Sequence, residues 1–233
     1  MLASPQRAGA RVARLCGFLE CAAAARPRTG PVSPDFTCSV NPPPSASPVD
    51  AAAPFADPRL NGRPLKRVAF SEAEIAERVR ELGREITAAY PDGELLVLGL
   101  LKGSFIFLSD LVRQICRPLH VDFLVASSYG SDTVSSGTVR LLYDPETTLE
   151  GKHILLVEDI VDSGRTLQKL MALLGERGPR SLEICALLHK HIASHLTHPV
   201  RFVGFDAPEE FLVGYGLDHA EHFRHVPYVA SLQ

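Results

Sequence analysis

The chain of 233 residues is 45% hydrophobic and 22% charged and has no tryptophan, which is the composition of an ordinary globular protein of one or two domains. Collagen, a coiled coil and a wholly disordered chain are excluded. Residues 1–64 hold seven arginines against four acidic residues, whereas the rest of the chain carries 17 basic and 23 acidic groups, a net charge of −6. We therefore expect no general nucleic-acid-binding surface.

Neither a membrane span nor a disulfide framework is expected. The longest apolar stretch, residues 15–25, is interrupted by Glu20, and no window reaches the roughly 18 apolar residues that a span requires. Five cysteines are an odd number; three fall in the first 38 residues, and Cys116 and Cys185 stand alone in apolar runs. This usage favours a reducing compartment, and we expect the protein in the cytoplasm.

The N-terminal segment differs in composition from the rest of the chain. Eleven of the 18 prolines lie in residues 1–64, where no helical or strand periodicity is sustained. Such a segment cannot bury enough apolar surface to offset its chain entropy, so we expect residues 1–64 to be a disordered extension and residues 65–233 to be the folded domain. Up to Pro34, five arginines and one acid are typical of an organellar transit peptide. A transit peptide, a disordered tail and a mis-assigned start codon stay open as alternatives.

The first predicted element is a helix over residues 72–89. Ser71 and Glu74 have the spacing of a capping box, and apolar residues follow at helical spacing: Ile75, Val79, Leu82 and Ile86. Residues 95–101 then form a continuous apolar run, which predicts a strand buried on both faces. A second helix is predicted over residues 104–116.

The same order of elements recurs along the chain. We predict a strand over residues 121–128, a polar loop over 130–138, a strand over 154–157, a helix over 166–176 and a strand over 182–188. Alternating strands and helices predict an α/β fold with an open, mainly parallel sheet flanked by helices. Ligands bind such sheets at the carboxyl ends of the strands, so the chemistry is expected in the loops after residues 101, 128, 157 and 188.

The most informative segment is VEDIVDSGRT, residues 157–166, between a predicted strand and a predicted helix. Gly164 allows a tight turn, and Ser163 and Thr166 offer hydroxyl donors. The free N–H groups at the start of a helix form a pocket for a phosphate dianion. Glu158 and Asp159 would repel that phosphate, so we expect them to face sugar hydroxyls or a divalent metal ion. Acidic strand ends before a small-residue helix cap are also common for purely structural reasons.

The complete string resembles the 5-phosphoribosyl-1-diphosphate (PRPP) loop of type I phosphoribosyltransferases. Asp162 resembles the residue typical of the 6-oxopurine branch, the hypoxanthine-guanine phosphoribosyltransferase family. The resemblance spans about residues 68–231 and implies that Asp162 is the general base at purine N7, and that Glu158 and Asp159 bind Mg²⁺. The PRPP-binding residues that it implies are Glu158, Asp159, Asp162, Ser163, Gly164, Arg165 and Thr166.

Further matches follow in family order. Leu101-Lys102-Gly103 resembles the pyrophosphate loop, in which the first of these peptide bonds can be cis, and Arg224 resembles the arginine that holds pyrophosphate. Ser128-Tyr129 resembles the start of the flexible loop that closes over the reacting centre.

The purine site is implied by residues near the C-terminus, in a small base-binding hood. Lys190 resembles the lysine that donates to purine O6. Phe211 would stack on the purine, the Leu212 backbone would bind its edge, and Asp218 would assist a second Mg²⁺. Departures from the family pattern are Arg165 in a variable position, Leu212 where valine is common and His219 where tyrosine is common.

The resemblance implies a magnesium-dependent purine salvage enzyme. It would transfer the 5-phosphoribosyl group of PRPP to a 6-oxopurine base, hypoxanthine or guanine, and so form IMP or GMP and pyrophosphate. It would bind neither nucleic acid nor membrane and would form a homo-oligomer, a dimer or a tetramer. Two alternatives stay open: a PRPP-sensing regulatory protein with the same fold, and a phosphoribosyltransferase for xanthine or another base. The acidic body and the set Asp162, Lys190 and Phe211 count against the regulatory protein.

Overall fold

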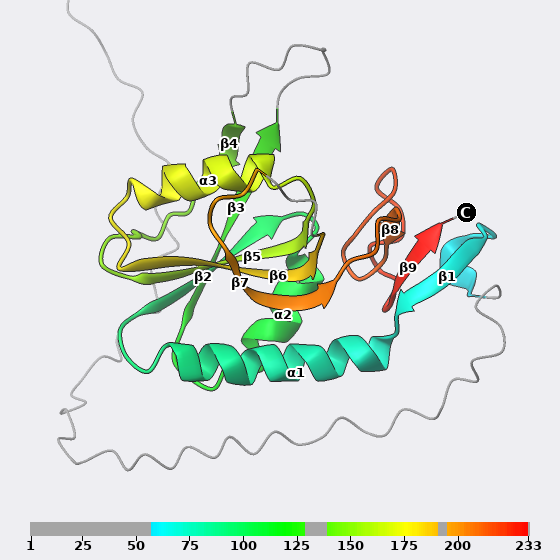
Figure 1. Ribbon diagram of the computed structural model, residues 1–233, viewed down its shortest axis with the longest axis horizontal. Coiled ribbons are helices and arrows are strands. Elements are labelled where there is room, and N and C mark those ends of the chain that lie inside the picture. Colours follow the sequence, from blue (N-terminus) through cyan, green and yellow to red (C-terminus); the bar gives the residue numbers. More distant parts are fainter. Residues whose placement is uncertain (1–56, 129–138, 191–194, 233) are drawn as a thin grey trace, which may run out of the picture. The chain divides into compact units, whose positions relative to one another are not determined.

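A central sheet of six strands organises the computed structural model, which describes residues 57–128, 139–190 and 195–232 (Figure 1). The strand order is β4-β3-β2-β5-β6-β7, and every neighbouring pair is parallel except β3 and β4. This confirms the predicted α/β fold with a mainly parallel sheet. The strands are β2 (Leu95–Leu101), β3 (His120–Ser128), β4 (Val139–Tyr143), β5 (His153–Val161), β6 (Ser181–His189) and β7 (Val200–Asp206).

Helices cover both faces of this sheet. Helices α1 (Glu72–Ala89) and α2 (Phe105–Val112) lie on one face, and α3 (Arg165–Gly175) lies on the other (Figure 1). The capping box of α1 is formed, since Ser71 N donates to Glu74 Oε2 at 2.8 Å and Glu74 N donates to Ser71 Oγ at 3.3 Å. The four apolar residues predicted to form its inner stripe are all buried.

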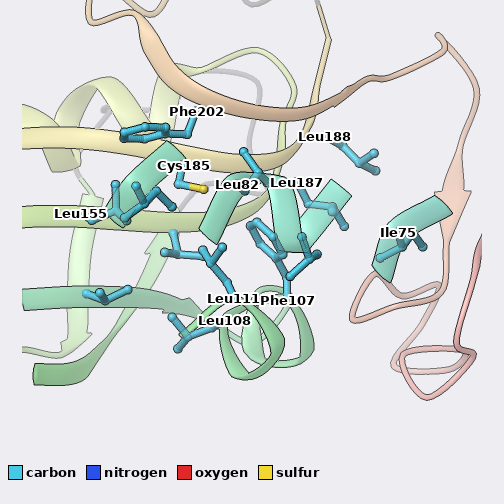
Figure 2. Close-up of a cluster of buried hydrophobic side chains, with 14 of the residues drawn as sticks. Ile75, Leu82, Phe107, Leu108, Leu111, Leu155, Cys185, Leu187, Leu188 and Phe202 are labelled. Atoms are coloured by element: carbon cyan, nitrogen blue, oxygen red, sulfur yellow. The ribbon is translucent and has the colours of Figure 1, made fainter. Parts of the chain in front are cut away.

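Two hydrophobic clusters fill the space between the sheet and the helices. Figure 2 shows part of the first, in which Phe107, Leu108 and Leu111 of α2 pack beside side chains of β5 and β6. The second cluster joins the other face of the sheet to α3 through Leu167, Leu170, Met171 and Leu174. No helix of the described chain combines the length and the apolar character that a membrane span requires.

Two elements differ from their predicted bounds by more than one residue at an end. Helix α2 ends at Val112 instead of residue 116, because the chain turns to pack on α1: Cys116 N donates to Thr87 Oγ1 at 3.0 Å, and Gln114 lies directly over Gly83. Strand β5 does not end at residue 157 but continues to Val161, because its ladder with β6 continues beyond the apolar run. The acidic pair that follows residue 157 therefore belongs to a strand and not to a loop.

A second, antiparallel sheet forms the hood, in the order β1-β9-β8. Its strands, which were not predicted, are β1 (Leu65–Phe70), β8 (Leu212–Val213) and β9 (Val229–Leu232). A short 3₁₀ helix, Pro58–Leu60, packs on this sheet; Leu60 is 1% exposed in the hood core, and Tyr228 Oη donates to Asp57 at 2.9 Å. These contacts place residues 57–64 in the folded hood, whereas the composition placed them in the extension. Residues 1–56 lie outside the described part of the chain.

Candidate active site

The turn that is predicted to bind phosphate lies between β5 and α3. Gly164 is the N-cap of α3 and has φ +74°, a conformation that favours glycine, and a Cβ there would lie 2.8 Å from Leu196 Cβ. Among the described residues, no side chain forms a hydrogen bond that caps the start of helix α3. Its first N–H groups are therefore free to receive an anion, next to the half-buried Thr166 and the exposed Ser163 and Arg165.

The two carboxylates in β5 occupy different environments. Burial raises the pKa of Asp159 to about 6, although Ile160 N donates to its Oδ1 at 2.9 Å. Burial also raises the pKa of Glu158 well above its usual value, and the neighbouring Asp159 adds to this rise. Glu158 Oε2 is buried and has no hydrogen-bond partner among the described residues. A buried carboxylate oxygen without a partner favours a bound cation or donor at this place.

The loop after β2 reaches this strand end through Gly103. The Leu101–Lys102 peptide bond is cis, as the resemblance implied. A Cβ on Gly103 would lie 1.7 Å from Asp159 Oδ2, so only glycine lets the loop pass so close to the carboxylate. Ser104 holds the loop on β2, since its buried Oγ donates to Leu100 O at 2.7 Å.

The hood meets the same loop from the other side. A Cβ on Gly216 would lie 2.0 Å from Gly103 O, and Gly216 has φ +103°. Arg224 Nη1 donates to Gly216 O at 2.8 Å, while its Nη2 lies 2.7 Å from Asp218 Oδ1. Tyr215 Oη donates to Asp110 Oδ2 in α2 at 2.8 Å, which anchors the hood on the core. Arg224 is thus held beside the loop after β2, the loop that is predicted to bind pyrophosphate.

The proposed base and the proposed purine lysine lie together at neighbouring strand ends. Asp162 follows β5, Lys190 follows β6, and Lys190 Nζ lies 3.4 Å from Asp162 Oδ1. Lys190 N also donates to Val161 O at 2.9 Å, which extends the ladder between the strands. Asp162 is 59% exposed and Lys190 16%, so the carboxylate is open to a ligand while the lysine is mostly enclosed.

Two hood residues predicted to bind the purine, Phe211 and Leu212, differ in how they are placed. Phe211 is 58% exposed, and its ring lies 5.4 Å from that of His219 between centroids at an interplanar angle of 72°, so much of the Phe211 ring is accessible to a ligand. Leu212 is in β8, the outer strand of its sheet, where one edge of the backbone is not used by β9. That edge can present N–H and C=O groups to a base.

Comparisons with known proteins agree with this geometry. Residues 71–220 match the family model described as a phosphoribosyl transferase domain. The chain is 51% identical over 172 residues to a hypoxanthine-guanine phosphoribosyltransferase of Dictyostelium discoideum, covering 72% of this chain and 96% of that protein. It is 49% identical over 167 residues to a hypoxanthine phosphoribosyltransferase of Salmonella typhimurium, covering 71% and 94%. A crystal structure of a hypoxanthine phosphoribosyltransferase from Staphylococcus aureus is similar, with TM-score 0.70, 40% identity and 72% and 92% coverage.

The chain belongs to the hypoxanthine-guanine phosphoribosyltransferase family. The residues that the resemblance to this family singled out thus lie around one edge of the sheet and in the facing hood. This cannot be said of Ser128 and Tyr129. Tyr129 lies outside the described residues, and Ser128 is placed only as the last residue of β3.

The Mg²⁺ implied by the family fits the donors of this site. Within the described chain, no three His, Cys, Asp or Glu side chains gather closely enough to hold a metal ion by themselves. Mg²⁺ is, however, usually bound by one or two carboxylates together with substrate phosphates and waters. The unpartnered oxygen of Glu158 and the carboxylate of Asp159 suit that mode. Asp218 is already engaged, since its Oδ2 accepts from Glu221 N at 2.8 Å and its Oδ1 contacts Arg224.

Sequence reasoning missed two residues that the structure places at the site. Glu221 contacts both Lys102 and Arg224, and Tyr215 anchors the hood on α2. Both lie inside the segment that carries the purine and pyrophosphate matches. An acid between Asp218 and Arg224 was the available signal for Glu221, but its partner Lys102 lies 119 residues away in the sequence.

Proposed function

We propose that the protein transfers the 5-phosphoribosyl group of PRPP to N9 of hypoxanthine or guanine and releases pyrophosphate. The observation that carries this is the contact between Asp162 and Lys190 next to the free N-terminus of α3. A phosphate on that helix start would place the ribose of the same molecule beside the two side chains. Membership of a family whose relatives bear this activity in their names supports the proposal.

Asp162 is proposed as the general base that receives the proton from purine N7. Its carboxylate is exposed and lies 3.4 Å from Lys190 Nζ, so a base that contacts this lysine would also lie within reach of the carboxylate. Lys190 is proposed to donate to the O6 atom of the base. Adenine has an amino group at that position and cannot accept this hydrogen bond, so Lys190 selects 6-oxopurines.

Binding of the diphosphate is proposed to use Lys102, Gly103 and Arg224, which the structure holds on one side of the site. Glu158 and Asp159, with Asp218 for a second ion, would hold Mg²⁺. Bound magnesium would neutralise the charge that develops on the leaving pyrophosphate. The body of the chain is net acidic, so a polyanionic substrate has to be bound by local contacts and not by a broad basic surface. These contacts would be the two cations, Lys102 and Arg224, and the Mg²⁺ that the carboxylates would hold.

A panel of bases assayed with PRPP and magnesium tests the proposed function. We expect pyrophosphate release with hypoxanthine and guanine, and little with adenine; efficient use of xanthine or a pyrimidine, or no release with any base, would contradict it. Asp162→Asn tests the mechanism, because it keeps the shape but cannot accept a proton as a carboxylate. We expect kcat to fall by about 10² to 10⁴ with a small change in the KM for PRPP. A kcat close to wild type would leave Asp162 as a binding residue only.

The homo-oligomer and the cytoplasmic location stay predictions. Support for self-association comes from large apolar side chains left exposed on the described surface, including Phe105, Val121 and Phe123. Val121 and Phe123 are two residues apart in β3 and therefore share one face of the sheet, and neighbouring exposed apolar groups are typical of surfaces that another protein covers. Sedimentation velocity of the full chain distinguishes a monomer from a dimer or a tetramer.

A further inference from the structure

Glu221 lies where the two cations proposed for pyrophosphate meet. Lys102 Nζ lies 3.2 Å from each of its carboxylate oxygens, and Arg224 Nη2 lies 3.4 Å from Oε2. Lys102 belongs to the loop after β2 and Arg224 to the hood. One carboxylate therefore bridges the two segments that the diphosphate of PRPP would have to bridge.

The backbone presents Glu221 in a conformation that its residue type avoids. His219 and His222 exchange two backbone hydrogen bonds, of 3.2 and 3.1 Å, around Ala220 at φ +53° and Glu221 at φ +66°. This is the geometry of a tight turn that usually selects asparagine and glycine, because other residues are disfavoured in the left-handed region. Glu221 N is fixed as well, since it donates to Asp218 Oδ2 at 2.8 Å. Held conformations of this kind are concentrated at functional sites.

We propose that Glu221 is an internal competitor of the diphosphate group, occupying Lys102 and Arg224 in the free protein and leaving them when PRPP or pyrophosphate binds. The inference rests on the proposed function. Lys102 and Glu221 are 67% and 65% exposed, and ion pairs so exposed are weak and exchange readily with solvent and ligands. Glu221 would thus weaken the binding of pyrophosphate without blocking the site. Its return to the two cations would favour release of the product, a step that often limits kcat.

A positioning role for Glu221 predicts the opposite effect. If its carboxylate served to hold Lys102 and Arg224 in place for the substrate, its removal would weaken diphosphate binding. If it is a competitor, its removal frees Lys102, removes one of the two carboxylate contacts of Arg224, which keeps Asp218 Oδ1 at 2.7 Å, and takes away a negative charge next to a polyanion. The sign of the change in pyrophosphate affinity therefore decides between the two roles.

The test is calorimetric titration of inorganic pyrophosphate into the full chain, with magnesium present and no nucleotide or base, so that no reaction can take place. For Glu221→Gln, which keeps the size and the polarity of the side chain, we expect pyrophosphate to bind about three- to tenfold more tightly than to wild type. The gain should shrink as salt is raised, because exposed charges are screened. In stopped-flow measurements the rate constant of pyrophosphate dissociation should fall by a similar factor.

Glu210→Gln is the matched control. Glu210 is another hood carboxylate paired with two cations, at 2.8 Å from Lys66 and 3.1 Å from Arg67. Its variant loses the same charge and the same kind of ion pair, and pyrophosphate affinity should not change. An equal gain in both variants would indicate a general effect of net charge and would overturn the proposal.

A double-mutant cycle locates the effect. In a Lys102→Ala background, Glu221→Gln should lose most of its gain, because the group for which the carboxylate competes is absent. Unchanged or weaker pyrophosphate binding by Glu221→Gln, in a protein with wild-type Tm, would overturn the inference and leave the proposed function standing. Failure of the wild-type protein to bind pyrophosphate at all would overturn the proposed function and this inference together.

Discussion

Replacing Gly103 by alanine is expected to displace Asp159 without changing any charged group. The added Cβ would lie 1.7 Å from Asp159 Oδ2 and 2.4 Å from its Cγ. An ordinary contact is about 3.4 Å, so the carboxylate or the loop must move by about 1.7 Å. A misplacement of about 1 Å at a reacting centre can cost about 10² in rate, and we expect kcat/KM for PRPP to fall by at least that factor. The crowding itself should cost about 1 to 3 kcal/mol of stability.

Gly175→Ala is the matched control for this substitution. Gly175 ends α3 and a Cβ there meets no atom within 4 Å, so alanine should keep kcat/KM and leave the Tm unchanged or slightly raised. Both variants are assayed with PRPP varied at saturating hypoxanthine and magnesium, and thermal melts show that each is folded at the assay temperature. If Gly103→Ala keeps kcat/KM within threefold of wild type, the close packing of Asp159 on the pyrophosphate loop has no role in activity.

Three further results are expected. A chain that starts at Asp57 should be as stable and active as the full chain. A chain that starts at Arg63, and the variant Leu60→Ala, should each lose about 2 to 5 kcal/mol of unfolding free energy, because both remove the buried Leu60 side chain from the hood core. Equal midpoints of urea denaturation would contradict this. Lys190→Ala should raise the KM for hypoxanthine and for guanine by about 10- to 100-fold and leave the KM for PRPP unchanged. Loss of PRPP binding would instead make Lys190 a phosphate ligand. Arg59 is the main cause that lowers the pKa of Asp57 to about 2, so its carboxylate stabilises the fold above the unfolded pKa of about 4 and loses that effect as pH falls through about 2. Urea denaturation should show Asp57→Asn less stable than wild type at pH 6 and the difference narrowing from pH 4 downward; a constant difference would refute the ionic role.

Elements with a strong local pattern were predictable from the sequence. Helix α1 and strand β2 have the predicted bounds, because the capping box and the apolar periodicity of α1, and the unbroken apolar run of β2, are local signals. The end of α2 was not predictable, since the contact of Cys116 with Thr87 joins residues 29 apart. The hood strands were missed for the same reason: β1 pairs with β9, from the opposite end of the domain.

The site was predictable in its residue types and not in its contacts. The resemblance named Lys102, Arg224, Asp162 and Lys190, because the family motifs are short and contiguous. It did not show that in the free protein each cation already contacts a carboxylate of the chain, Lys190 with Asp162 and the other two with Glu221. These ion pairs depend on how the loops after β2, β5 and β6 converge with the hood.

Gly103 shows why that convergence needs the fold as well as the motif. Its missing side chain is required by Asp159, at the end of β5, and its carbonyl lies within 2.0 Å of where a Cβ of Gly216 would be. Two glycines from distant segments therefore allow a strand end, a loop and the hood to meet at one point. In the sequence each of these glycines is explained by a motif of its own. In the structure Gly103 is required by Asp159, and Gly216 is required by the carbonyl of Gly103. A larger residue at 103 would therefore displace the carboxylate of β5, and a larger residue at 216 would push the hood away from the loop after β2.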